Sequence, residues 1–225
     1  MALKKEKYNS IAVVFLQSLK VGFVLLFLFN SYNSFSQMSF KERNKFYKEL
    51  KFNAKENNDE VFVITKDNVK HSGKKFKFPP AYFATSNFIK IDDVKYDRKQ
   101  RENIIAWQDD ESYNVYHKNA EYDAVRYVKG KVNLYQYVIT PANFGSKIPT
   151  SYIYFLLEKE KFEFIDATSE NIEAVFSDNK LVINKFHELY PEAVRKKTKY
   201  PNQNKHTDEY AWIENIVMLT QLYNK

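Results

Sequence analysis

Cysteine is absent from this chain of 225 residues. Its absence excludes disulfides, thiolate zinc sites, a cysteine nucleophile and a cysteine-linked lipid anchor. Glycine is almost as scarce, and because its four copies are not grouped, the glycine-rich loops that cradle nucleotide phosphates are excluded too. The sequence therefore excludes functions that depend on cysteine thiols or on glycine-rich phosphate-binding loops.

Long apolar runs are also few, and the clearest one lies near the N-terminus. It covers residues 21–29, shorter than the about 18 to 20 residues that a membrane-spanning helix needs. Lysines precede it, a polar stretch follows, and small residues stand at Ser34 and Ser36, which is the order of regions in a secretory signal peptide. We expect cleavage after Ser36 and a periplasmic or secreted protein without a membrane span.

A longer segment leaves one alternative open. Residues 11–29 together reach spanning length, although Gln17, Ser18 and Lys20 interrupt the apolar pattern. On that interpretation the N-terminal segment stays attached as a membrane anchor.

Hydrophobic and aromatic residues are abundant: 44% of the residues are hydrophobic and 17% are aromatic, which is enough to form a sizeable core. The net charge is +7, but residues 1–36 carry four lysines and one glutamate, so without them it falls to +4. A solvated basic surface accounts for this charge better than a nucleic-acid site, and we expect no nucleic-acid partner.

The order of elements predicts an α+β fold. Residues 60–166 read as short antiparallel strands separated by turn residues, and residues 167–225 read as helices packed on the resulting sheet. The sheet is either open or a small, partly closed barrel. Residues 1–36 form the signal peptide and residues 37–59 an N-terminal helix or leader.

Strand periodicity and turn residues give the expected strands. They are 60–65, 69–78, a hairpin over 87–97 turning at Asp92-Asp93, 103–108, 113–118, 122–128, 132–140, 152–158 and 162–166. Helices are expected over 39–56 after Ser39, then after Thr168, after Ser177 or Asp178, from Pro191, and after Thr207.

Catalytic motifs are sparse. The chain has no G-x-S-x-G, its four histidines form no H-E-x-x-H, and we expect no metal site and no cofactor. The acidic pairs Asp92-Asp93 and Asp109-Asp110 fall in predicted hairpin turns, where aspartate is favoured for backbone reasons. The chain therefore reads as a non-enzymatic protein more readily than as an enzyme.

Basic residues beside aromatic ones are the strongest binding signal, because such pairs can hold acidic polymers. One such segment contains Lys95, Tyr96, Arg98, Lys99 and Arg101, and a second contains Arg195, Lys196, Lys197, Lys199 and Tyr200. Tyr135 and Tyr137 alternate along a predicted strand and are expected on its outer face. The loops 79–86 and 141–150 are further candidates for a binding surface.

Two motifs stand out: a strand start reads Gly130-Lys131-Val132-Asn133-Leu134-Tyr135, and a helical tail ends in Leu222-Tyr223-Asn224-Lys225. In these motifs the chain resembles a group of uncharacterised secreted proteins common in Bacteroidetes. The resemblance covers roughly residues 60–225. It implies an exported protein with a β-rich front and a helical tail, and it implies no activity.

These observations favour an exported envelope protein that binds a partner protein or an acidic polymer. The alternative is a hydrolase that acts on envelope polymers through carboxylates brought together by the fold, which would require two acids in one pocket.

Overall fold

The computed structural model describes residues 38–77, 88–97, 103–117, 123–139, 152–196, 199–200 and 209–225. The chain divides into two units, Met1–Asn44 and Lys45–Lys225. Both sheets and all but the start of the first described helix belong to the second unit.

Helix α2 (Phe40–Asn53) begins where the sequence predicts. The Ser39 backbone N–H and hydroxyl both donate to Glu42 Oε2, at 2.8 and 2.7 Å, and the Glu42 N–H donates to Ser39 Oγ at 3.4 Å. This reciprocal capping box satisfies N–H groups that have no acceptor inside the helix.

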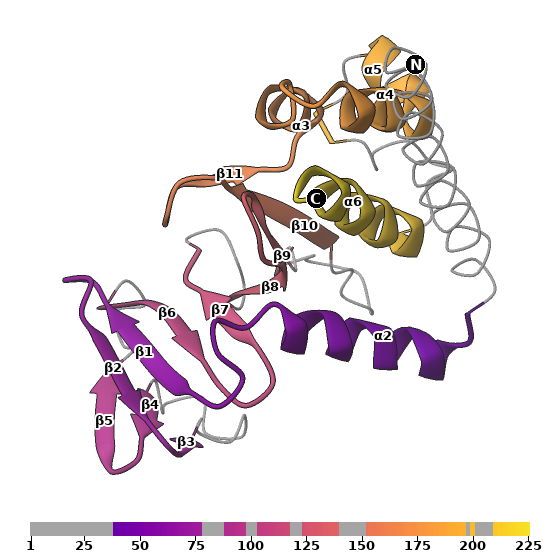
Figure 1. The fold of residues 1–225 in the computed structure, drawn as a ribbon. Helices are drawn as coiled ribbons and strands as arrows, with labels where there is room; N and C mark the ends of the chain where they lie inside the picture. The colour runs from indigo at the N-terminus through magenta and orange to yellow at the C-terminus, as the bar shows by residue number, and fades with distance from the viewer. Residues whose placement is uncertain are drawn as a thin grey trace, which may run out of the picture. The chain divides into compact units, whose positions relative to one another are not determined.

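The predicted antiparallel sheet is confirmed, and it is open, with β11 and β2 at its edges. Its strand order is β11-β10-β9-β8-β7-β6-β1-β2 (Figure 1). The strands are β1 (Val61–Thr65), β2 (Lys70–Gly73), β6 (Ile104–Gln108), β7 (Tyr113–Val115), β8 (Ala124–Val128), β9 (Asn133–Ile139), β10 (Tyr152–Glu158) and β11 (Phe164–Asp166). From β6 to β11 each strand pairs with the next along the chain, which is the meander expected of strands joined by turns.

A second, smaller sheet was not predicted. It contains β3 (Phe76–Lys77), β4 (Phe88–Ile91) and β5 (Val94–Asp97). The sequence predicts one strand over 69–78, but the chain leaves the large sheet at Gly73, where a Cβ atom would overlap the Ile91 side chain. Asp92 Oδ1 accepts from the N–H groups of Lys74 and Lys75, at 3.1 and 2.8 Å, and so fixes this crossing.

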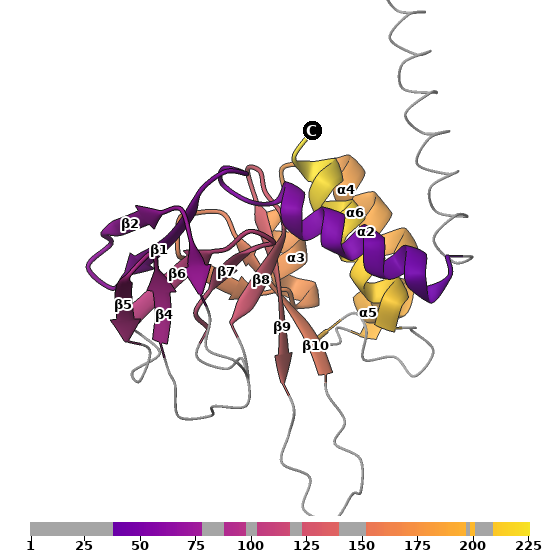
Figure 2. The same cartoon turned by 90° about the horizontal axis from the view of Figure 1, so that it is seen from below.

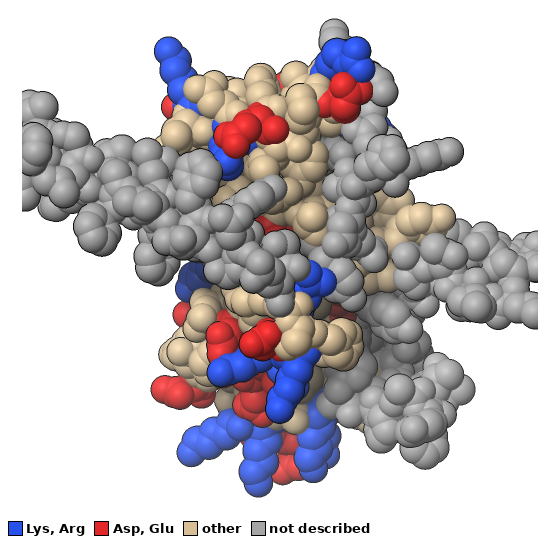
Figure 3. Space-filling view, turned by 90° about the vertical axis from the view of Figure 1, so that its right-hand side faces the viewer, with Lys and Arg blue, Asp and Glu red and all other residues tan. Residues whose placement is uncertain are grey.

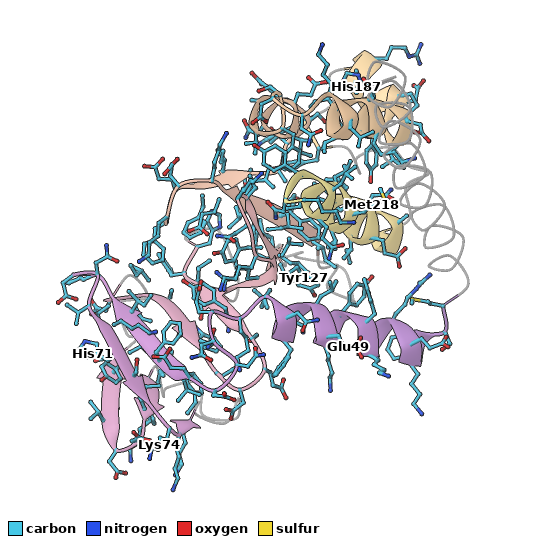
Figure 4. The ribbon with its side chains drawn as sticks, in the orientation of Figure 1. Glu49, His71, Lys74, Tyr127, His187 and Met218 are labelled. Carbon is cyan, nitrogen blue, oxygen red and sulfur yellow. The ribbon has the colours of Figure 1, made fainter. Side chains whose placement is uncertain are left out.

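The helices cover one face of the large sheet at β8, β9 and β10, which we call the helix face (Figures 1 and 2). On the same side of the sheet, Val61 and Val63 of β1 pack against Ile89 and Ile91 of the small sheet. The helices beside α2 are α3 (Ser169–Val175), α4 (Lys180–Leu189), α5 (Pro191–Lys196) and α6 (Glu209–Tyr223). Strand residues Phe155 and Leu157 belong to one core cluster with Trp212 of α6, and the ring centroids of Phe155 and Trp212 are 5.7 Å apart. Tyr127, labelled in Figure 4, has its ring centroid 6.1 Å from that of Tyr47 on α2. The predicted packing of helices on the sheet is thereby confirmed.

Thr168 caps α3 and Pro191 opens α5, as predicted. The cap of α4 differs from the prediction: Asn179 accepts from the Val182 N–H at 3.3 Å, in place of Ser177 or Asp178. The predicted cap at Thr207 lies outside the described residues. No helix in the described ranges is both long and apolar enough to cross a membrane.

The opposite face of the sheet, the strand face, has a core of its own. Its members are strand residues together with Phe162 of the turn before β11. Phe62, Tyr113, Tyr135 and Phe164 form a row of neighbouring rings across it, with centroids 6.0, 6.3 and 5.4 Å apart. Tyrosine dominates here because a ring can be buried while its hydroxyl finds a polar partner.

Candidate functional site

The strand face ends in a group of aromatic side chains that are only partly buried. We call Tyr137, Tyr154, Tyr200 and His117 the tyrosine cluster; Tyr137 is buried and the other three are half-buried. Asp166, also half-buried, lies beside them on β11. Five segments that are distant in sequence contribute to this one place.

Each ring of the cluster lies next to at least one other ring of the cluster. The centroids of Tyr137 and Tyr154 are 5.5 Å apart and their planes differ by 25°, so these two rings are stacked. Tyr154 meets the edge of Tyr200 at 5.1 Å, and His117 lies 4.8 Å from Tyr137. These spacings are those of favourable aromatic pairs, so the cluster forms a continuous platform of rings.

The strand register places the platform at the end of the sheet. Tyr154 stands opposite Tyr137, and Tyr152 stands opposite Ile139. Strand β11 pairs with β10 only from Leu156 to Glu158, so the start of β10 extends beyond it. Tyr152, on the same face as Tyr154, is consequently 47% exposed and prolongs the platform toward solvent.

The segment that carries Tyr200 is tied to α3, because the Ser169 N–H donates to the Lys199 carbonyl at 2.9 Å. The Lys199 Nζ lies 5.3 Å from the centroid of the Tyr200 ring. A cation therefore stands at one end of the aromatic row, in the arrangement that attracts anionic groups to a stacking surface.

Asp166 supplies the carboxylate of the site. Its Oδ1 accepts from the Tyr137 hydroxyl at 2.8 Å, and its main-chain carbonyl accepts from Asn171 Nδ2, also at 2.8 Å. Burial and this hydrogen bond raise the pKa of Tyr137 well above its ordinary value. Burial, followed by the charge of Asp166, also raises the pKa of Tyr200. Both hydroxyls are therefore neutral near pH 7 and can donate or accept hydrogen bonds.

Deeper on the strand face, Glu158 is buried among hydrogen-bond donors. Its Oε2 accepts from the Tyr135 hydroxyl and from Asn133 Nδ2, both at 2.6 Å, and its Oε1 accepts from the Phe162 N–H at 2.7 Å. A buried carboxylate needs such donors to replace lost water. Every contact of Glu158 serves the strands around it, which assigns it a structural role.

Arg126 is 2% exposed and anchors the connection between α2 and β1. Its Nε donates to the Ala54 carbonyl and its NH1 to Glu56 Oε1, both at 2.6 Å, while the guanidinium lies 3.9 Å from the centroid of the Tyr113 ring. Gln108 Nε2 holds the same connection by donating to the carbonyls of Asn57 and Glu60, at 2.8 and 2.7 Å. This network ties the connection between α2 and β1 to strands β6 and β8.

Four carboxyl groups have a shifted pKa whose direction bears on acid catalysis. The pKa values of Glu42, Glu56, Glu60 and Asp67 are all lowered. A general acid in glycoside hydrolysis needs the opposite shift. The described residues also contain no group of three or more metal-ligating side chains.

The structure describes some of the residues predicted to form a binding surface, and their exposure differs. Lys95 is exposed on β5, with its Nζ 4.4 Å from the centroid of the Phe88 ring, and Tyr96 is half-buried, 5.2 Å from the His71 ring. Arg98, Lys99 and Arg101 lie outside the described residues, as do the candidate loop 141–150 and the loop 79–86.

Tyr135 and Tyr137 require a correction. They share one face of β9, as the alternation predicts, but they are 1% and 3% exposed and do not form an outer surface. The reason is that the strand face is packed as a core, which alternation along one strand cannot reveal. The sequence signals that were missed are Tyr152 and Tyr154, which alternate in the same way on the neighbouring strand.

The side of the molecule shown in Figure 3 carries charges of both signs. In Figure 3, basic and acidic side chains are interspersed over the side of the molecule that it shows. The position of Lys199 beside aromatic rings is therefore a local feature, distinct from the general excess of lysine.

A pocket lies between the end of α2 and the turn that joins β6 to β7. This pocket has a volume of about 280 Å³, and its walls include Lys48, Lys51 and Phe52 on one side and Asp110 and Glu111 on the other. It shares no residue with the tyrosine cluster.

Comparison of the chain with protein-family models, curated proteins and solved structures found no match. Its function has to be inferred from its own residues.

Proposed function

We propose that this protein is an exported, non-enzymatic binding protein of the cell envelope, and that its tyrosine cluster holds an acidic polysaccharide. The export signal in residues 1–36 supports the compartment. The single observation that carries the ligand class is the row of rings from Tyr137 to Tyr200 with Lys199 at its end.

The chemistry of an acidic sugar matches this row. The C–H bonds on one side of a sugar ring carry partial positive charge and pack well against the negative face of an aromatic ring. Half-buried Tyr154 and Tyr200 offer such rings next to 47%-exposed Tyr152. Hydroxyl groups of the sugar could donate to Asp166, and a carboxylate of the polymer would be attracted to Lys199.

Native affinity electrophoresis tests this proposal, with alginate as an acidic polysaccharide and dextran as a neutral one. We expect alginate, and not dextran, to retard the protein. Tyr154→Ala and Tyr200→Ala should each weaken alginate binding about threefold to tenfold, because each removes one stacking contact worth about 1 kcal/mol. Lys199→Gln should weaken it about twofold to fivefold and reduce its sensitivity to salt.

Tyr96→Ala is the matched control. Tyr96 is also a half-buried tyrosine next to a lysine, but it lies on the small sheet. Unchanged retardation of this variant is expected. Equal mobility of the wild-type protein with alginate and with dextran would refute the proposal, and so would loss of binding in Tyr96→Ala with full binding in Tyr154→Ala.

A further inference from the structure

The pocket at the end of α2 is formed by two segments that are held firmly. On one side, the turn after β6 is fixed by Asp109 Oδ1, which accepts from the N–H groups of Glu111 and Ser112 at 2.8 and 2.7 Å. On the other side, the buried Lys55 Nζ donates to the carbonyls of Asn58 and Asp110, at 2.9 and 3.1 Å. Lys55 therefore ties one wall to the other, and the pocket is present before any ligand arrives.

The lining of this pocket includes one aromatic ring. Phe52, near the end of α2, is 41% exposed. The Lys55 Nζ lies 5.0 Å from the centroid of the Phe52 ring and leaves ring surface open to the pocket. An apolar side chain of a ligand would cover that surface.

The walls carry charges of opposite sign that do not neutralise each other. Lys48 and Lys51 belong to α2, and Asp110 and Glu111 belong to the facing turn. Within the described ranges, none of these four side chains forms an ion pair, although Glu49 at the rim is paired with Lys45 at 3.8 Å. The pocket thus has two basic groups on α2, two acidic groups on the facing turn and the ring of Phe52 in one lining.

We infer that this pocket binds a short zwitterionic peptide with one apolar side chain. The peptide carboxylate would face Lys48 and Lys51, its ammonium group would face Asp110 and Glu111, and its apolar side chain would lie on Phe52. A volume of about 280 Å³ is at the lower end of small-molecule sites, which suits one or two residues. This site is separate from the tyrosine cluster and does not depend on its function.

Isothermal titration calorimetry with alanyl-phenylalanine tests the inference. The probe is compared with its N-acetylated form, its C-terminal amide and its doubly blocked form. We expect the free dipeptide to bind best and each block to weaken binding about twofold to fivefold, as expected for ion pairs at an exposed site. The doubly blocked form should be weakest.

Substitutions in the pocket test which residues face the peptide carboxylate and which face its ammonium group. The double variant Lys48→Gln, Lys51→Gln should lose the preference for a free carboxylate and keep the preference for a free ammonium group. The double variant Asp110→Asn, Glu111→Gln should show the reverse, and Phe52→Ala should weaken all four probes. Lys180→Gln, which removes an exposed lysine from α4, is the charge control and should bind like the wild type.

Three results would overturn the inference. They are the absence of binding by a folded wild-type protein at millimolar dipeptide, equal binding of the free and doubly blocked forms, and full binding by Phe52→Ala. Affinity electrophoresis with alginate tests the tyrosine cluster independently of this pocket. The Phe52→Ala variant should be retarded by alginate as the wild type is.

Discussion

On the helix face of the large sheet, the Phe155 ring meets Trp212 within an apolar cluster, whereas on the strand face Tyr135, Glu158 and Arg126 are buried with hydrogen bonds and an ion pair. Apolar packing stabilises in proportion to the area it covers and is insensitive to pH. A buried polar group stabilises only while each partner is present and in the right protonation state. The two faces of one sheet should therefore fail in different ways.

The contrast also bears on function. The helix face is closed by α2 to α6, while the strand face continues outward into the tyrosine cluster. Polar and aromatic groups that would be costly in an apolar core can serve there as ligands for a polymer. The difference suggests that one face holds the fold together and the end of the other does the binding.

The largest effect should come from the helix face. Trp212→Ala is expected to lower the free energy of unfolding by about 3–5 kcal/mol, because it leaves a cavity where the ring now meets Phe155 and Tyr190 at 5.7 and 5.6 Å. Urea denaturation followed by circular dichroism measures this. Leu181→Ala, at a 56%-exposed position, should cost less than about 0.5 kcal/mol. A loss below about 1 kcal/mol for Trp212→Ala would contradict the packing.

Arg126→Met should lower the free energy of unfolding by about 1–3 kcal/mol, measured in the same way. The Ala54 carbonyl and Glu56 would lose their donor, and only the 39%-exposed Glu56 side chain can be rehydrated easily. Lys129→Met, which removes a half-exposed partner of the same glutamate, should cost less than about 1 kcal/mol. An equal loss in the free energy of unfolding for Arg126→Met and Lys129→Met would contradict a larger contribution from the buried Arg126 than from the exposed Lys129.

Alkali should destabilise the strand face through Tyr113, although burial also raises the pKa of Tyr127 on the helix face. Burial, opposed by Arg126 and reinforced by Glu158 and Glu56, raises the pKa of Tyr113 far above its ordinary value of 10.0. A raised pKa gives stability that is complete below pH 10 and is lost as the pH rises, because only the unfolded chain ionises.

Tyr113→Phe keeps the ring and removes this proton. Above pH 10 its free energy of unfolding should fall less steeply than that of the wild type, by about 1.4 kcal/mol for each pH unit. Urea denaturation at several pH values between 9 and about 11 measures the difference. Identical slopes would show that Tyr113 ionises in the folded protein.

The smallest effect should appear in acid. Burial raises the pKa of Glu56, but hydrogen bonds from Lys129 and Arg126 outweigh it, so the pKa lies below its ordinary value of 4.5. Glu56 therefore stabilises the fold above pH 4.5, and this contribution is lost as the pH falls through the lowered pKa. Glu56→Gln should remove that dependence, about 1 kcal/mol or less because the group is half-exposed. An unchanged acid dependence would assign it to other carboxylates.

Much of the fold could be predicted because turns and caps are local. Asp92-Asp93, Thr168 and Pro191 act through the backbone next to them, and the structure places them as expected. The start of α4 was missed by one or two residues because three neighbouring side chains can all cap a helix.

The two motifs that carried the family resemblance meet in space. Asn224 Oδ1 accepts from the Val132 N–H at 3.0 Å, and Asn224 Nδ2 donates to the Val132 carbonyl at 2.9 Å. Gly130 makes room, since a Cβ atom there would overlap Asn224. The two residues of this pairing are 92 positions apart in the sequence, so the sequence alone could not reveal it.

The candidate site was only partly predictable for the same reason. Alternation along β9 puts Tyr135 and Tyr137 on one face, but it cannot tell whether that face is solvent or core. The meeting of Tyr137 with Tyr154 and Tyr200 depends on strand register and on the position of residues 199–200 against α3. Likewise Arg126 and Glu158 look like surface residues in the sequence, because charged side chains are seldom fully buried.

The most direct test of the central claim is a spectrum of the protein with ¹³C-labelled tyrosine rings, recorded as alginate oligosaccharides are added. Signals are assigned by single Tyr→Phe variants. We predict that the signals of Tyr152, Tyr154 and Tyr200 move together, while those of Tyr96 and the buried Tyr113 stay in place. Movement of Tyr96 alone, or of no tyrosine in a sample that binds alginate, would contradict the placement of the binding surface at the end of the strand face.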